Sequence, residues 1–171
     1  IAVMIFPILK VHDEALALGY VALRIVEAVS SIAAAAGALA VIAVSQEYVS
    51  MGAPDAVYSQ TLGTSLLAAR AVWVGPMLAI FFGLAALLLY YLLYQSKLVP
   101  RFISVWGFIG VALVLAWNLL ELFGISVTVG MVLALPMILN EIFLALWLIF
   151  RGFNSSAIAS LSAKTELNET T

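Results

Sequence analysis

Four apolar stretches, each long enough to cross a lipid bilayer, follow one another along this chain and restrict it to one class of fold. The hydrocarbon core of a bilayer is about 30 Å thick, and a helix needs about 20 apolar residues to span it. Because lipid offers the backbone no hydrogen-bond partner, each such stretch must be helical. We predict complete spans at about residues 14–44, 65–95, 101–123 and 127–150. The sequence therefore predicts an all-α, polytopic transmembrane helix bundle.

A fifth apolar segment stands at the N-terminus and is too short to be a complete span. Residues 1–9 are apolar and the first of them is not Met. They lack the basic region and the small-residue cleavage site of a signal peptide. We interpret them as the end of one partial span. The expected organisation is an N-terminally incomplete bundle over residues 1–153, followed by a polar, disordered cytoplasmic tail over 154–171.

The composition supports a membrane protein and excludes several kinds of site. Of the 171 residues, 65% are hydrophobic and 9% are charged, whereas a soluble domain is about 25% charged. The net charge of −2 argues against a nucleic-acid partner. The chain has no cysteine and one histidine, His12, which excludes thiol catalysis and cysteine-ligated zinc. Without a nucleophile motif, a metal-ligand cluster or a glycine-rich phosphate loop, we expect neither an enzyme nor a bound cofactor.

Lysine and arginine alternate between the predicted connections and give an orientation. Lys10 follows the partial span, Lys97 and Arg101 lie in the third connection, and Arg151 and Lys164 follow the last span. The second and fourth connections contain no basic residue. Basic residues are enriched in cytoplasmic loops. We therefore expect the inner (plasma) membrane, with a cytoplasmic C-terminus and residues 45–64 outside.

Glycine and proline mark the predicted breaks between and within helices. Residues 45–64 form the longest predicted break, because glycine, proline and aspartate favour turns. Gly75-Pro76 should interrupt the span at 65–95, since proline removes a backbone donor. Pro100 suits the first turn of the next helix, and Gly124 suits a C-terminal cap.

A polar stripe lies inside the first complete span. It consists of Tyr20, Arg24, Glu27 and Ser31. Their spacings of four, three and four residues place them on one helix face. A charge that faces lipid costs at least a few kcal/mol, so this face should point into protein or water. From the helix rise, Glu141 lies at about the depth of Arg24. With Asn140 added, the candidate buried polar cluster is Tyr20, Arg24, Glu27, Ser31, Asn140 and Glu141.

A second candidate cluster is expected nearer the outer side. It consists of Arg70, Asn118 and Glu121. Arg70 and Glu121 can pair, and the amides of Asn118 and Asn140 can donate to the carboxylates of the two clusters.

These clusters admit a structural and a functional interpretation. In the first, ion pairs fix the packing of a non-enzymatic bundle, because pairing avoids an isolated charge in lipid. In the second, the Arg/Glu cluster belongs to a transporter or binding protein for a small solute or ion. An acid–base role for Glu27 and Glu141 lacks a reactive group beside them. The lipid bilayer is the expected partner. A homo-oligomer is also left open, through the small residues of 30–40.

Several segments together resemble one known family. They are Glu14-Ala-Leu-Ala-Leu-Gly19-Tyr-Val-Ala-Leu-Arg24-Ile-Val-Glu27, the stretch from Phe82 to Arg101, Ser104-Val-Trp106-Gly-Phe-Ile-Gly110, and the stretch from Leu135 to Asn154. The chain resembles the bacterial multi-pass membrane family called domain of unknown function 4386 over nearly its whole length. The resemblance implies a membrane helix bundle with further N-terminal spans. It implies no activity, ligand or catalytic residue.

Overall fold

The structure, a computed structural model, describes residues 2–52, 56–125 and 128–160. Its elements are α1 (Ala2–Leu9), α2 (Glu14–Ser50), α3 (Ala56–Val72), the π-helical turn η1 (Trp73–Met77), α4 (Leu78–Ser96), α5 (Arg101–Leu122) and α6 (Gly130–Phe150). Four helical segments are long and apolar enough to cross a membrane: α2, the continuous segment Gln60–Ser96, α5 and α6. The prediction of an all-α membrane bundle with four spans is confirmed.

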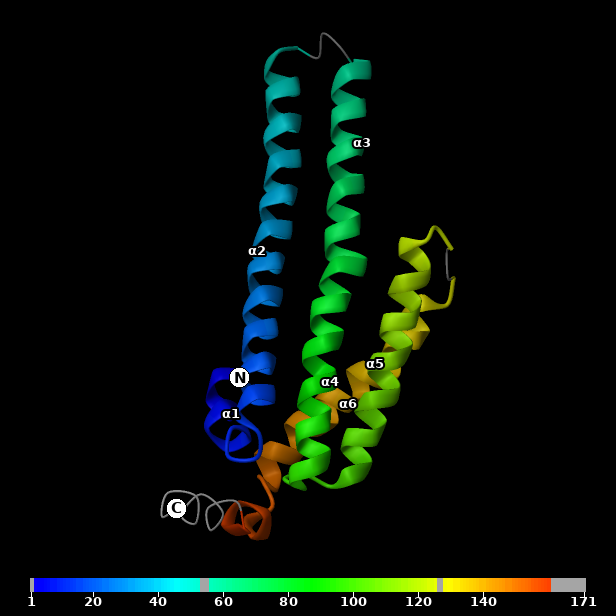
Figure 1. The fold of residues 1–171 in the computed structure, drawn as a ribbon. Coiled ribbons are helices and arrows are strands. Elements are labelled where there is room, and N and C mark those ends of the chain that lie inside the picture. The colour runs from blue at the N-terminus through cyan, green and yellow to red at the C-terminus, as the bar shows by residue number, and fades with distance from the viewer. Residues whose placement is uncertain (1, 53–55, 126–127, 161–171) are drawn as a thin grey trace.

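Helix α4 lies at the centre of the bundle. It packs against α2 on one side and α5 on the other, and α6 packs against α5 (Figure 1). Helix α1 packs against α2 near the start of that helix. Helices α2 and α3 form a long hairpin that extends well beyond the turn between α5 and α6 (Figure 1). The tightly packed core is therefore at one end of the molecule, around α4, α5 and the turn between them.

Small residues bring α5 close to both of its neighbours. A Cβ atom added to Gly110 would lie 2.9 Å from the Cα of Met137 in α6. A Cβ at Gly107 would collide with the ring of Tyr90 in α4. In lipid, where hydrophobicity does not drive helices together, such close backbone approach is a main source of packing energy. The glycines of α5 thus fix how α4 and α6 pack on it.

The break predicted at residues 45–64 is wrong in its extent. Helix α2 continues to Ser50 and α3 begins at Ala56. Hydroxyl groups in this region donate to carbonyl oxygens one turn earlier, as in Ser45 to Val41 at 2.9 Å and Thr61 to Val57 at 2.8 Å. Because these polar side chains are satisfied within their own helices, they did not end them. Residues 51 and 52 form a turn after α2, and residues 53–55 lie outside the described part of the chain.

The interruption predicted at Gly75-Pro76 is confirmed and takes the form of η1. Pro76 has no N–H group to complete the α-helical ladder, and π-helical turns inside long helices accommodate such a defect. Gly124 follows α5 with a φ of +78°, as expected of a residue that ends a helix. Helix α6 begins at Gly130, three residues later than predicted.

The predicted tail is only partly described. Residues 155–160 are helical, and Ala157 among them is buried against the core. Residues 161–171 lie outside the described part of the chain.

Candidate functional site

A groove between α2, α4 and α6 is lined by two charged residues of the first predicted cluster, Arg24 and Glu141. Its volume is about 820 Å³. Tyr20 and Arg24 of α2, Tyr90 of α4 and Glu141 of α6 contribute polar groups to its lining. The rest is mostly apolar and includes Val21, Ile25, Leu89, Met137 and Leu144.

The charge of Arg24 is neutralised within its own helix. Its Nη1 lies 2.8 Å from Oε2 and 3.2 Å from Oε1 of Glu27. The guanidinium carbon also lies 5.4 Å from the ring centroid of Phe82 in α4 and 5.7 Å from that of Tyr20. Arg24 therefore joins α2 to α4 through an aromatic ring, while its ion pair stays inside α2.

Glu141 faces Arg24 across the groove without pairing to it. Within the described residues, the ion pair of Arg24 with Glu27 is the one salt bridge, and no hydrogen bond reaches the carboxylate of Glu141. The side chains of Arg24 and Glu27 are 25% and 20% exposed, and Glu141 is exposed. The predicted buried charged cluster is thus wrong in two respects. The three groups are not buried together, and the contact between Arg24 and Glu141 is not formed.

The remaining members of that cluster have other roles. Asn140 is fully buried, and its Nδ2 donates to the carbonyl oxygen of Ile103 in α5 at 2.9 Å. It therefore connects α6 to α5. The prediction that Asn140 donates to a carboxylate is wrong. Ser31 is exposed and donates to the carbonyl oxygen of Glu27 at 2.9 Å. The hydroxyl of Ser31 is therefore satisfied within its own helix, and Ser31 does not line the groove.

The second predicted cluster does not form an ion pair. Glu121 accepts a hydrogen bond from Nε1 of Trp117 at 2.7 Å, four residues earlier on α5. Asn118 donates to the carbonyl oxygen of Val114 at 2.9 Å. Among the described atoms, Nε of Arg70 is buried without a hydrogen-bond partner. Local partners on α5 thus satisfy Asn118 and Glu121.

Sequence reasoning missed two sets of residues. Tyr90, near the end of α4, is buried and lines the groove. Lys97, Arg101 and Arg151 had been used only to orient the chain, yet they line one cavity of about 530 Å³. The available signal was their position at the ends of helices that terminate on the same side. No group of three or more acidic, cysteine or histidine side chains in the described segments is placed to hold a metal ion.

The chain was compared with known protein families, curated proteins and solved structures. Residues 1–152 match the family described as "Domain of unknown function (DUF4386)". No curated protein and no solved structure matches the chain significantly.

Proposed function

The chain belongs to the DUF4386 family, and from the groove we propose that it is a non-enzymatic membrane protein that binds a small solute. The observation that carries the proposal is the carboxylate of Glu141, which lines an otherwise mostly apolar cavity without a paired cation among the described residues. A carboxylate in apolar surroundings is stabilised by a cation or a hydrogen-bond donor. A ligand can supply that group.

The size and lining of the groove suit a small ligand with an apolar body. Pockets that bind small molecules usually have volumes of about 300–1,000 Å³ and combine apolar walls with a few polar groups. The groove has a volume of about 820 Å³ and presents Leu89, Met137 and Leu144 beside Glu141. Since Arg24 is already paired with Glu27, the carboxylate of Glu141 is the group available to a ligand. This arrangement favours a hydrophobic cation.

A purely structural role is the second candidate, and one observation favours it. The guanidinium of Arg24 lies against the ring of Phe82 and so holds α2 to α4. However, its ion pair with Glu27 lies within one helix and cannot by itself fix the packing of two helices. We propose no acid–base chemistry for Glu27 and Glu141, because Glu27 does not line the groove that contains Glu141.

We also propose that the end of the molecule carrying the α4–α5 turn faces the cytoplasm. Lys10, Lys97, Arg101 and Arg151 all lie in or next to connections at that end. The positive-inside rule then places the α2–α3 turn outside.

The binding proposal can be tested with tetraphenylphosphonium, a hydrophobic cation, added to the full chain in nanodiscs. We expect saturable binding that Glu141→Gln weakens about tenfold, since the variant keeps the shape of the side chain and removes its charge. Glu47→Gln is the matched control, because Glu47 is an exposed carboxylate on α2 outside the groove. Equal affinity of the wild type and Glu141→Gln would contradict the proposal. Equal loss in both variants would indicate a nonspecific charge effect and would also contradict it.

A further inference from the structure

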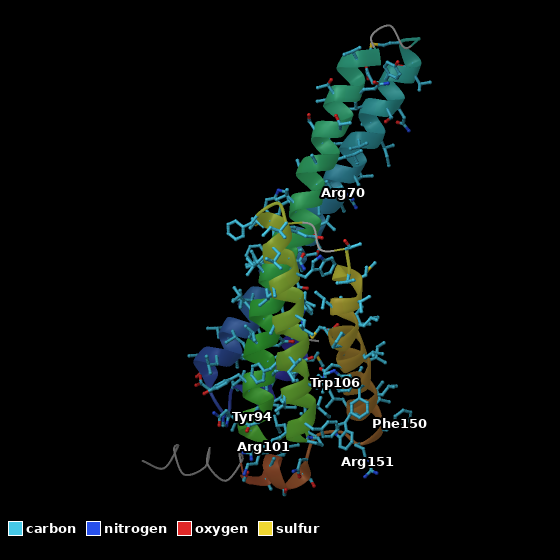
Figure 2. The ribbon with its side chains drawn as sticks, turned by 90° about the vertical axis from the view of Figure 1, so that its right-hand side faces the viewer. Arg70, Tyr94, Arg101, Trp106, Phe150 and Arg151 are labelled. Carbon is cyan, nitrogen blue, oxygen red and sulfur yellow. The ribbon has the colours of Figure 1, made fainter. Side chains whose placement is uncertain are left out.

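Three basic side chains meet in a cavity at the end of the bundle opposite the α2–α3 turn. We call it the basic pocket. It is formed by Lys97 from the α4–α5 turn, Arg101 at the start of α5, Trp147 from α6, and the segment from Arg151 to Ser155. Its volume is about 530 Å³. Figure 2 places Arg101 and Arg151 at this end, and Arg70 toward the other.

The fold holds the three cations in place from separate elements. Lys97 follows the last residue of α4 and has a left-handed backbone, with a φ of 55°. The guanidinium carbon of Arg101 lies 5.0 Å from the ring centroid of Tyr94, which limits where that side chain can go. The backbone N–H of Asn154 donates to the carbonyl oxygen of Leu98 at 2.9 Å. This bond fastens the chain after α6, and with it Arg151, to the α4–α5 turn.

Among the described residues, the positive charge of the basic pocket has no neighbouring carboxylate. No carboxylate lines it, and none of its three cations forms a salt bridge with the residues that the structure describes. Like charges held together repel one another unless an anion joins them. Arginine matches the geometry of a phosphate with two parallel hydrogen bonds, and lysine adds a compact point charge.

The surroundings of the basic pocket indicate a lipid as the source of that phosphate. Trp147 lines the pocket, and Phe150, which is 80% exposed, lies beside Arg151 at the same end of the bundle (Figure 2). Tryptophan is enriched at the boundary between membrane and water. A headgroup held by the cations could therefore leave its acyl chains against exposed apolar side chains such as Phe150. Basic pockets between transmembrane helices recognise anionic lipid headgroups.

We propose that the basic pocket binds the phosphate of an anionic phospholipid headgroup. This site is separate from the groove, because the two cavities share no lining residue. The proposal therefore stands or falls independently of solute binding.

The test is native mass spectrometry of the full chain in micelles that contain equal amounts of phosphatidylglycerol and phosphatidylcholine. We expect the wild type to retain phosphatidylglycerol preferentially. Arg151→Gln and Lys97→Asn should each reduce that preference about fivefold, the effect of one basic residue near an anionic surface. Neither side chain forms a hydrogen bond, salt bridge or ring contact with the described residues, so both variants should fold, which far-UV circular dichroism checks.

The matched control is Lys10→Gln, which removes one positive charge at the same end of the bundle but outside the basic pocket. It should keep the wild-type preference. Equal retention of the two lipids by the wild type would overturn the proposal, and so would an equal effect of all three variants. If millimolar inorganic phosphate displaced phosphatidylglycerol completely, the pocket would be assigned to free phosphate and the lipid proposal would be overturned.

Discussion

At the scale of single residues, the main question is how this chain tolerates an arginine and a glutamate in the middle of an apolar helix. Arg24 and Glu27 are three residues apart, so they lie on one face of α2 and pair at 2.8 Å. Both residues belong to α2, so the pair needs no contribution from another helix. Its charges can therefore enter the membrane together, and the aromatic rings of Tyr20 and Phe82 cover the guanidinium.

This arrangement predicts that removing one charge is worse than removing both. Arg24→Met keeps a long apolar stem against Phe82 but leaves the carboxylate of Glu27 unpaired. Because the pair is partly exposed, we expect a loss of about 1–3 kcal/mol in the free energy of unfolding, less than for a fully buried pair. Such a loss corresponds to a fall of several degrees in the melting temperature. Thermal unfolding in detergent, followed by circular dichroism, measures it.

The control for this prediction is the double variant Arg24→Met with Glu27→Gln. It has no charge at either position, so its melting temperature should recover most of the loss. If the single and double variants melted at the same temperature, the cost would come from lost packing and the charge argument would be wrong.

The candidate site could be predicted from sequence only as far as helix periodicity extends. Periodicity placed Arg24 and Glu27 on one face, and helix rise placed Glu141 at their depth. Neither argument contains the rotation of α6 about its axis. That rotation turns Asn140 into the interface with Ile103 and Glu141 into the groove. Which of two adjacent polar residues faces a neighbouring helix is decided by tertiary packing, which a single sequence does not contain.

At the scale of the elements, the position of α5 is determined by glycines, because neighbouring residues occupy the space that a side chain would take. The Cβ that Gly110 lacks would lie 2.9 Å from the Cα of Met137. The end of a flexible side chain can relieve such a clash by changing rotamer, but a backbone atom moves only if the helix moves. The approach of α5 to α6 therefore depends on this glycine more than on any helix propensity.

We predict that Gly110→Ala destabilises the bundle although alanine is the better helix former. Alanine gains about 1 kcal/mol in helix propensity, whereas forcing a methyl group against a packed backbone costs about 1–3 kcal/mol. Moving α6 away from α5 would also weaken the hydrogen bond from Asn140 to Ile103. We expect a net fall of several degrees in the melting temperature. The control is Gly37→Ala on α2, where an added Cβ meets nothing within 4 Å. That variant should melt at or above the wild-type temperature, and a similar loss in both variants would refute the packing argument.

Element boundaries show where local signals succeed and where they fail. Gly75-Pro76 changes the backbone itself, so its effect on the helix was predictable, and it produces η1. Ser45, Thr61 and Ser65 are polar without being helix breakers, because each hydroxyl bonds back to its own helix. Polarity predicted a loop in that region, whereas the structure contains two helix ends joined by a short turn.

At the scale of the whole molecule, the helices have unequal lengths. At 1.5 Å per residue, the 22 residues of α5 and the 21 residues of α6 are each about 32 Å long, close to the thickness of the hydrocarbon core. The 37 residues of α2 are about 56 Å long. If the ends near the basic pocket lie at one membrane surface, the α2–α3 hairpin projects about 20 Å beyond the opposite surface. Figure 1 shows this difference in length directly.

The chain lacks cysteine, so single cysteines can test this placement without a background. Ser50→Cys lies at the end of α2 in the projecting hairpin, and Gln95→Cys lies near the end of α4 beside the basic pocket. Both positions are exposed. We expect a membrane-impermeant maleimide added to intact cells to label Ser50→Cys rapidly and to leave Gln95→Cys unlabelled. In inverted membrane vesicles the pattern should reverse.

The unequal lengths make this experiment more informative than a usual topology assay. A residue at the edge of a bilayer reacts slowly from its own side, but Ser50 should stand about 20 Å clear of the surface, where water reaches it freely. Fast labelling of Ser50→Cys from outside would therefore support both the orientation and the projecting hairpin. Slow labelling from outside would keep the orientation but would mean that the hairpin tilts or lies along the membrane. If Gln60–Ser96 spans the bilayer, Ser50 and Gln95 lie on opposite sides of the membrane. Labelling of both cysteines from the same side would therefore contradict the four-span arrangement.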